Sequence, residues 1–310
     1  MTLSPLFARS IPGGPIVISD MEVHPGKVYF VDSSHADKSN AVSGGRSPDK
    51  PFSTLAYVFS ATLTPVLAAG DVVYVMPSHA ETIAAAAGIA CATAGVKVIG
   101  LGWGSKRPTF TWSATDSSWT VTAAGVTIKN IRVTSSVNEL VSMFAVSAAD
   151  VTLDAVDLID AGAALEVIQF LLTTSAATRI LVQNCYHYAT TAAASAQLWI
   201  ALVSVTGARI LDNTFILKLA DAATSSVINM DTGVRFAEIG RNIIHLTGYS
   251  AATVSAILGH ANATGICHDN RIAGDVAAVT TLNDFPGGYS LENYCVRAVD
   301  KSGVLDPVIV

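Results

Sequence analysis

The sequence predicts an all-β chain in which short strands stack into a parallel solenoid. Three observations favour this fold: an asparagine recurs at nearly constant spacing, apolar runs of strand length alternate with turn residues, and only 14% of the 310 residues are charged. Self-similarity at a period of 20–50 residues indicates units that stack on one another. A unit of that size cannot bury its own apolar face, so its neighbours must complete the core.

The repeated position holds an asparagine in six units, at Asn130, Asn184, Asn213, Asn242, Asn270 and Asn293. Successive intervals from Asn184 onward are 29, 29, 28 and 23 residues, and Ala155 fills the one intermediate position upstream. Asparagine tolerates the positive φ angles of tight corners, and its amide can satisfy backbone groups that a turn leaves unpaired. We therefore expect a ladder of asparagine side chains along one corner of the solenoid. The alternative is that each asparagine only forms a turn.

Bulk composition excludes several classes of protein. The net charge is −6 and no basic stretch occurs, so nucleic-acid binding has no electrostatic footprint. No apolar run approaches the ~20 residues of a transmembrane helix. The four cysteines show neither close pairing nor metal-ligand spacing, so we expect no disulfide framework, no metal and no other cofactor. The low charge favours a surface that is partly hidden in an oligomer.

The chain divides into three predicted segments: an extended N-terminal arm over 1–26, one solenoid domain over 27–300 and a short tail over 301–310. Proline and glycine recur in the arm, and such a segment is poorly ordered unless it docks on a partner. Within the domain we expect strands over 27–31, 71–76, 118–122, 144–147, 170–174, 202–206 and 227–231. We expect kinks at 124–125, 149–150, 206–207, 232–233, 264–265 and 287–288, most of which contain glycine.

One helix is predicted, over residues 52–64. Its apolar side chains fall on a single stripe, at Phe52, Leu55, Ala56, Phe59 and Leu63. Asp49 or Ser53 would cap its start, and Pro65 limits its end. We expect this helix to cover the open end of the stack, where unpaired strand edges otherwise invite aggregation.

Five segments resemble a known family. Residues 29–34, 44–55 and 69–77 run YFVDSS, GGRSPDKPFSTL and AGDVVYVMP, and residues 78–83 and 100–110 run SHAETI and GLGWGSKRPTF. They resemble the opening strand, capping helix and first rungs of the right-handed parallel β-helix, or pectate-lyase-like, family. The compact β-helix proteins encoded by tailed bacteriophages are the subset they resemble most. The resemblance covers about residues 27–300 and implies a right-handed parallel β-helix of virion origin.

Residues that could carry chemistry are sparse. Enzymes on this fold need a carboxylate pair, or acidic calcium ligands beside a basic residue. Trp112 and Trp119 could line one loop with Asp116 between them, which is the best indication of a cleft. Asp154 and Asp157 lie close in sequence, but alternation along a strand points them to opposite faces. We expect them at solvated positions.

Two further clusters have structural explanations. Glu238, Arg241 and His245 suggest a structural ion pair more than a catalytic set. His79 and Glu81 follow the first rung, where the family has a turn, so we expect a turn role for them. No catalytic residue is predicted.

We expect a non-catalytic structural component of a bacteriophage virion, of the capsid decoration or cement type, made in the host cytoplasm. The family resemblance implies a homo-oligomer, preferably a trimer, and residues 1–26 would attach it to major capsid or tail proteins. Two alternatives stay open. One is a tail spike or fibre that binds a receptor, with or without cleavage of host surface polysaccharide as a lyase or glycosidase. The other is a non-catalytic adhesin that binds a host glycan.

Overall fold

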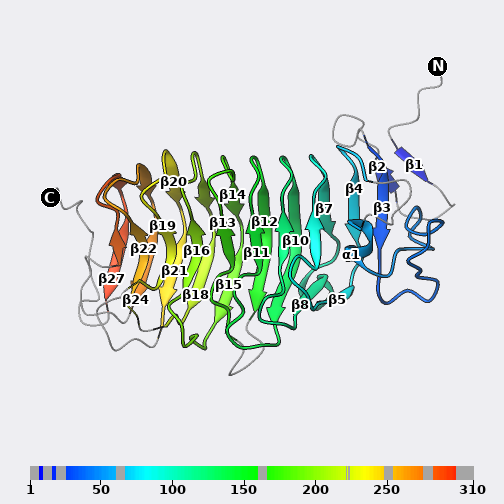
Figure 1. Ribbon diagram of the computed structural model, residues 1–310, viewed down its shortest axis with the longest axis horizontal. Coiled ribbons are helices and arrows are strands. Elements are labelled where there is room, and N and C mark those ends of the chain that lie inside the picture. Colours follow the sequence, from blue (N-terminus) through cyan, green and yellow to red (C-terminus); the bar gives the residue numbers. More distant parts are fainter. Residues whose placement is uncertain are drawn as a thin grey trace, which may run out of the picture.

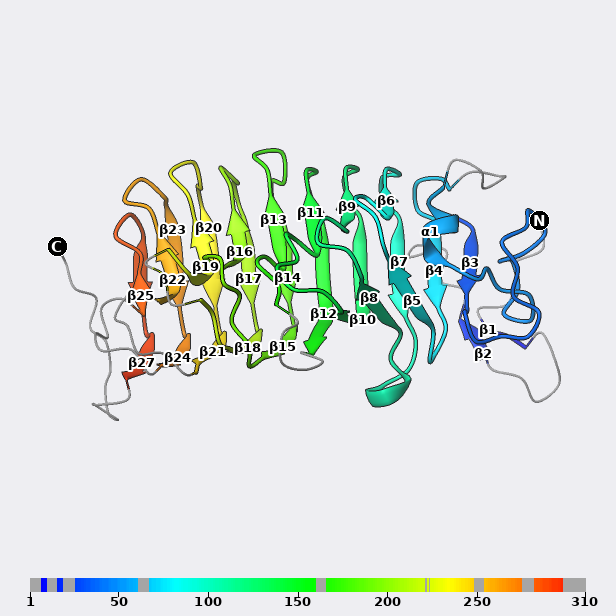
Figure 2. The same ribbon diagram turned by 60° about the horizontal axis from the view of Figure 1, so that its bottom comes forward.

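The protein is a parallel β-helix whose rungs follow one another along the long axis of the molecule (Figures 1 and 2). The computed structural model describes residues 26–60, 67–159, 166–220, 222, 224–247, 254–274 and 282–297, and the backbone of 7–9 and 16–18. The expected tail over 301–310 and most of the expected arm over 1–26 lie outside these ranges. Within the arm, β1 (Phe7–Arg9) and β2 (Ile16–Ile18) pair antiparallel with each other.

Strands of successive rungs pair in parallel and form three stacks. The first stack contains β3 (Val28–Val31), β4 (Val72–Val75), β7 (Lys97–Gly100), β14 (Leu181–Gln183), β17 (Arg209–Leu211), β20 (Ala237–Gly240), β23 (Gly265–His268) and β26 (Tyr289–Leu291). The second contains β5 (Ala80–Ile83), β8 (Thr109–Trp112), β15 (Tyr186–Ala189), β18 (Thr214–Leu217), β21 (Ile243–Leu246), β24 (Arg271–Gly274) and β27 (Tyr294–Arg297). Two long strands, β10 (Thr127–Ser135) and β12 (Thr152–Ile159), run through the corner and belong to both.

The third stack is a separate eight-stranded sheet. It contains β6 (Ile89–Cys91), β9 (Trp119–Val121), β11 (Phe144–Val146), β13 (Leu171–Thr173), β16 (Leu198–Leu202), β19 (Ser226–Met230), β22 (Ser255–Gly259) and β25 (Asn283–Asp284). One predicted strand, over 202–206, is misplaced: the strand β16 ends at Leu202, and residues 203–206 follow it without forming a strand. Ser204 there takes a φ of 54°, which ends the extended backbone.

Inward side chains from the three stacks fill one continuous core. Aromatic rings run through it from rung to rung, with centroid distances of 5.4 Å for Phe110–Trp119, 5.6 Å for Trp119–Phe144 and 5.3 Å for Phe144–Phe170. These rings are fully buried. Burying one such side chain stabilises the fold by about 1.5–3 kcal/mol relative to exposure. Because each ring packs on the next rung, the core depends on correct stacking order.

The expected helix is reduced to a single turn, α1 (Leu55–Val58). The side chain of Thr54 caps it, accepting a hydrogen bond from the Tyr57 N–H at 3.3 Å, so neither Asp49 nor Ser53 is the cap. Phe52 is not helical because its backbone pairs with β3: the Phe52 N–H donates to the Phe30 carbonyl at 2.8 Å. The end of the predicted helix, over 61–64, lies outside the described residues. The helical cap is therefore not confirmed.

The loop that precedes α1 closes the N-terminal end of the first stack instead. The Phe30 N–H donates to the Gly45 carbonyl and the Asp32 N–H donates to the Phe52 carbonyl, each at 2.8 Å. These bonds satisfy the free side of β3, which is otherwise paired only with β4. An unpaired edge is a template for aggregation, so an extended segment can protect it as well as a helix can.

A buried pair fastens α1 to the stack. Glu81 accepts hydrogen bonds from the Leu55 N–H at 2.6 Å and the Ala56 N–H at 3.0 Å. His79 lies 3.1 Å from Glu81 through Nε2, while its Nδ1 accepts from the Ser33 N–H at 2.9 Å. Both side chains are buried. His79 and Glu81 therefore join the opening segment to the second stack, a larger role than the predicted turn.

Register separates the repeated asparagines into two columns. Gln183 pairs with Leu211, so Asn184 lies opposite Asp212 and not opposite Asn213. The same alignment continues along the corner with Arg241. The column of positive-φ residues therefore holds Asn130, Ala155, Asn184, Asp212, Arg241, Asp269 and Glu292, with φ between 51° and 57°. The predicted single column is therefore wrong. Asn213 follows Asn184 by 29 residues, whereas the structural repeat at this corner is 28 residues, so Asn213 lies one position beyond the column.

The second column is a buried amide ladder, formed by Asn213, Asn242, Asn270 and Asn293. Asn213 donates from Nδ2 to the Asn242 Oδ1 at 3.0 Å, Asn242 donates to Asn270 at 2.9 Å, and Asn270 donates to Asn293 at 2.8 Å. Each Oδ1 also accepts a backbone N–H from the preceding rung, starting with Cys185 N–H to Asn213 at 2.9 Å. The ladder thus satisfies backbone groups that the corner turns away from the sheets.

Asn130 and Asn184 do not belong to this ladder. Asn130 donates from Nδ2 to the Gly100 carbonyl at 2.7 Å and the Gly102 carbonyl at 3.1 Å, and Asn184 donates to Asp154 at 2.9 Å. Both occupy the positive-φ position, which asparagine tolerates. For these two residues, the turn-forming alternative describes the structure better than the ladder.

We predict that Asn213→Leu destabilises the fold by about 3 kcal/mol, because three hydrogen bonds of about 1 kcal/mol each are lost at a buried position. Urea unfolding measures this change. The matched variant Asn184→Gly keeps the positive φ and removes one partly buried hydrogen bond, so we expect a loss of about 1 kcal/mol. Equal losses in the two variants would contradict the division into two columns.

His187 is a buried neutral group in the core. Its Nδ1 accepts from the Trp199 indole N–H at 2.8 Å, and its Nε2 lies 3.2 Å from the Val156 carbonyl. Burial lowers the pKa of His187 from 6.5 to about 3. Between these two pH values the unfolded chain binds a proton that the folded chain does not.

We therefore predict that His187 reduces stability progressively as the pH falls from 6.5 toward 3, by up to about 1.4 kcal/mol per pH unit. Urea unfolding at a series of pH values measures the slope. His187→Gln, which retains an acceptor and a donor, should flatten it, whereas the exposed control His245→Gln should leave it unchanged. An unchanged slope in His187→Gln would contradict the buried neutral assignment.

Candidate functional site

The outward face of the third stack carries little chemistry. Side chains that alternate with the core positions along this sheet are Ala90, Thr120, Ala145, Leu172, Ala201, Asn229, Leu258 and Asp284. Asp284 is the one acid in this column, and partial burial raises its pKa. A carboxylate without an acidic or basic neighbour in its column is a poor basis for hydrolysis or elimination.

The acids of the first stack are held in ion pairs. Asp154 lies 2.7 Å from the Lys129 ammonium, and Glu238 lies 2.7 Å from the Arg209 guanidinium. Burial alone raises the pKa of Asp154, but hydrogen bonds from Asn184 and Lys129 outweigh it and hold this pKa below its usual value. Asp154 is 7% exposed, so the expectation of a solvated side chain is wrong.

Asp154 and Asp157 do not form a carboxylate pair. Ala155 takes a φ of 53° between them and turns the chain from the first stack to the second. Asp157 then pairs with Arg107, which is itself 7% exposed. Ala155, and not strand alternation, therefore separates the two carboxylates, because the expected alternation does not continue through the corner.

The predicted tryptophan cleft does not form. Trp112 and Trp119 are fully buried, and each packs on Phe144, at centroid distances of 5.8 and 5.6 Å. Asp116 lies exposed in the loop between them. Both indoles occupy inward positions of their strands. The strand register decides this orientation, and the separation of the two tryptophans in the sequence does not. The exposed tryptophan is Trp103, which lies 5.5 Å above the Arg107 guanidinium.

Glu238, Arg241 and His245 also do not form a set. Arg241 makes a bidentate pair with Asp212, with both nitrogen–oxygen distances at 2.7 Å. This contact lowers the pKa of Asp212. His245 belongs to the second stack and has its side chain exposed. The structural interpretation of Glu238 and Arg241 holds, but their partners are Arg209 and Asp212.

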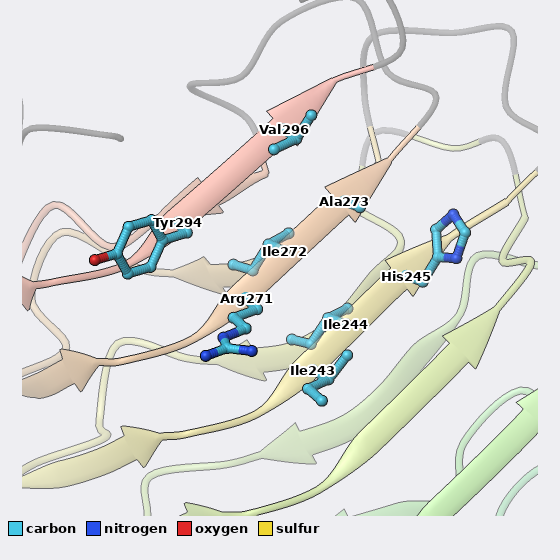
Figure 3. Close-up of a pocket in the computed structure, with 8 residues that line it drawn as sticks. All are labelled: Ile243, Ile244, His245, Arg271, Ile272, Ala273, Tyr294 and Val296. Atoms are coloured by element: carbon cyan, nitrogen blue, oxygen red, sulfur yellow. The ribbon is translucent and has the colours of Figure 1, made fainter. Parts of the chain in front are cut away.

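The described residues contain a groove on the outward face of the second stack, near the C-terminal end. A hollow of about 560 Å³ is lined by Ile243, Ile244, His245, Arg271, Ile272, Ala273, Tyr294 and Val296 (Figure 3). A second hollow of about 490 Å³ shares Ile243, Arg271 and Tyr294 with it and extends to Arg241, Asn242 and Asp269. Volumes of this size suit small ligands. We take these two hollows together as the candidate site and call them the second-stack groove.

Strand register explains how the groove arises. Ile243 pairs with Arg271, which pairs with Tyr294, so these three side chains form one outward column. Ala273 lies two residues beyond Arg271, in the neighbouring column between His245 and Val296. Its single methyl group leaves the depression. The sequence alone does not reveal these residues, because apolar residues in alternation suggest a core until the register is known.

Within the described ranges, no three His, Cys, Asp or Glu side chains gather closely enough to hold a metal ion. No helix in the same ranges has the length and apolarity needed to cross a lipid bilayer. The side chains that line the second-stack groove carry two guanidinium groups, one carboxylate, one amide, one phenol, one imidazole and apolar groups.

Comparison with family models and with curated proteins finds no match. Among solved structures, the chain is similar to a rhamnogalacturonan lyase, with a TM-score of 0.41 and 12% sequence identity over 91% of this chain and 90% of that one. At this distance the likeness carries no information about activity. The assignment of a parallel β-helix rests on the strand pairing itself.

We predict that Trp119→Ala destabilises the fold by about 3–5 kcal/mol, because a fully buried indole leaves a cavity. Chemical denaturation measures this loss. Removal of a binding-loop tryptophan would instead leave stability nearly unchanged, and Trp103→Ala, at 77% exposure, is the matched comparison. Equal stability of the two variants would restore the cleft interpretation.

Proposed function

We propose that the chain is a non-catalytic, homo-oligomeric structural component of a bacteriophage particle, of the capsid decoration type. The observation that carries this proposal is an apolar patch on the first stack at its C-terminal end. The patch contains Phe236 and Tyr289, each 75% exposed, with Leu291 at 53% and Ile266 at 43%. Ile266 pairs with Tyr289 and His268 pairs with Leu291, so these side chains lie on consecutive rungs.

Exposed apolar side chains that cluster in this way mark protein contacts more often than free surface. Aromatic residues are enriched where proteins meet, and the chain carries unusually little charge elsewhere to keep copies apart. The patch lies beside the last rung, where β26 and β27 each have a strand partner on one side only among the described residues. A further chain, or a further copy, would protect those edges.

The distribution of acids supports a role without catalysis. On the described strand faces, Asp154, Asp157 and Glu238 each lie in an ion pair with a lysine or arginine. Carboxylates neutralised in this way are not free to act as a general acid and base pair. The assignment to a bacteriophage particle rests on the family resemblance of the sequence. The same analogy suggests a trimer that is attached to the particle through residues 1–26.

We predict that size-exclusion chromatography with light scattering gives a mass of three copies of the 32.1 kDa chain. The double variant Ile266→Ser, Tyr289→Ser should shift the mass toward the monomer with little change in unfolding free energy, because neither side chain belongs to the core. Val42→Ser, at 55% exposure in the opening loop, is the control. An oligomer that survives the double variant would exclude the patch as the contact.

Electron microscopy of phage particles assembled with and without the protein tests the location. Extra density on the head in the presence of the protein is the expected result, and density on the tail would favour the receptor-binding alternative. Incubation with host surface polysaccharide tests cleavage directly. Released reducing ends or unsaturated sugars would overturn the non-catalytic proposal.

A further inference from the structure

The turn over residues 101–108, which joins β7 to β8, presents the most exposed of the large apolar side chains that the structure describes. Trp103 in this turn is 77% exposed, and it stands directly before the short 3-10 helix Gly104–Lys106. The other three tryptophans are at most 1% exposed: Trp112, Trp119 and Trp199. Figure 2 shows the turn projecting from the side of the stack. An exposed indole of this kind is typical of the residues that carry protein contacts.

Contacts within the chain hold this turn, which we call the Trp103 turn, in one shape. The Ser78 N–H donates to the Lys106 carbonyl at 2.8 Å. The Arg107 guanidinium lies 5.5 Å from the centre of the Trp103 ring and pairs with Asp157 on β12. A side chain that is already ordered loses little conformational entropy when it meets a partner, so the Trp103 turn is pre-organised for binding.

The Trp103 turn and the second-stack groove lie on the same corner, too far apart to meet within one chain. The turn connects the first stack to the second, and the groove extends to Arg241 and Asp269 at that junction. Six strand steps separate β8 from β24 in the second stack, through β10, β12, β15, β18 and β21. At about 4.8 Å per step the separation is about 29 Å, and about 19 Å remains even from β12, which the turn contacts. The groove can therefore receive Trp103 only from a second copy.

An indole suits the chemistry of the groove. Arg271 and Tyr294 lie side by side on consecutive rungs and line the hollow of about 560 Å³, whose other walls are mainly apolar (Figure 3). A guanidinium over the face of an indole is a favourable contact, and so is a pair of aromatic rings. The charges beside them are opposite: Lys106 is exposed in the Trp103 turn, and Asp269 lines the adjoining hollow. The turn and the groove are therefore complementary in apolar surface and in charge.

Exposed tyrosines lie midway between the turn and the groove. The strand β15 is three steps from β8 and three steps from β24. Its outward side chains, Tyr186 and Tyr188, are 40% and 39% exposed. A two-fold axis near β15 places the Trp103 turn of each copy opposite the groove of the other, with Tyr186 close to the axis. Two-fold contacts use the same patch on both copies, and aromatic residues are enriched in them.

We infer that two copies associate antiparallel through their second stacks, with Trp103 of each copy in the second-stack groove of the other. Trp103 packs on Tyr294 and over the Arg271 guanidinium, and Lys106 lies beside Asp269 of the other copy. This contact goes beyond the role proposed above and does not depend on it, because the apolar patch lies on the first stack. An aromatic side chain buries about 150–250 Å², so the contact is small and reversible, and it opens on dilution.

A concentration series on the intact chain measures the association. Sedimentation equilibrium and light scattering should show the weight-average mass rising with concentration to at least twice its dilute value. Trp103→Ala removes the indole, and Ala273→Phe fills the hollow that the indole enters. Each variant should weaken the association about tenfold or more. Each should also keep the unfolding midpoint of the parent chain, because neither side chain belongs to the core.

Mixing the two variants identifies which surfaces meet. A Trp103→Ala chain still has an open groove, and an Ala273→Phe chain still has its indole. An equal mixture can therefore form one of the two contacts, whereas neither variant alone can form any. The mixture should associate more strongly than either variant and more weakly than the parent chain. A contact between two Trp103 side chains would give no such gain.

Fluorescence and charge supply independent measurements. Trp103 is the exposed one of the four tryptophans, so acrylamide should quench part of the emission of a dilute sample and less of it at high concentration. Lys106→Glu should weaken association about fivefold, and added salt should reduce this difference, because an exposed ion pair is screened. Lys50→Glu makes the same charge change in the exposed opening loop and should leave association unchanged.

Four results would overturn the inference: a constant mass at all concentrations, full association in Trp103→Ala or Ala273→Phe, no gain on mixing these variants, and quenching that does not fall as the chain associates. Full association in Ala273→Phe is also the result expected if another segment of the same chain fills the groove. Each comparison is made relative to the dilute mass, so none of these outcomes depends on how many copies the apolar patch holds together.

Discussion

The structure depends on the parallel, in-register pairing of each rung with the next, and on the corner that makes this pairing repeat. At that corner a residue with φ near +55° turns the chain from the first stack to the second. Immediately after it, a buried amide joins neighbouring rungs in the later part of the solenoid. The turns between parallel strands leave backbone N–H and C=O groups that have no partner in a sheet. An amide side chain both donates and accepts hydrogen bonds, so it can pair with both kinds of group. Once this corner is set, the inward and outward sides of the flanking strands follow.

The ladder also shows where the stack changes character. Upstream of Asn213 the equivalent position is Cys185, then Val156 and Ile131, so the corner there is closed by apolar packing. The backbone N–H of Cys185 donates to the Asn213 side chain, so the rung of Cys185 is the boundary between the apolar corners and the amide corners. The amide corners carry side-chain hydrogen bonds from rung to rung as far as Asn293. The rungs that carry the amide corners are also those that carry the second-stack groove.

The apolar patch and the second-stack groove are separated by the same geometry. Outward positions of the first stack hold the apolar patch, and outward positions of the second stack hold Arg271 and its neighbours. The corner column of Asp212, Arg241, Asp269 and Glu292 runs between them and is mostly acidic. A charged corner of this kind keeps the two faces chemically distinct even though they lie on the same rungs.

The sequence by itself determined the fold class, the spacing of the rungs and the exclusion of helical architecture. These follow from a period near 28 residues, from strand-length apolar runs and from turn residues, all of which are local properties. It also indicated that asparagine matters at one corner. The tertiary structure alone decided which asparagines share a column, since Asn184 and Asn213 differ by one residue in register, and such a slip exchanges a buried position for an exposed one. It likewise decided that Trp112 and Trp119 lie in the core and that Arg271 lies beside Tyr294, without an ion pair to another described residue. Those facts depend on which residue lies opposite which across rungs, and residues about 28 positions apart meet only when the chain has wound.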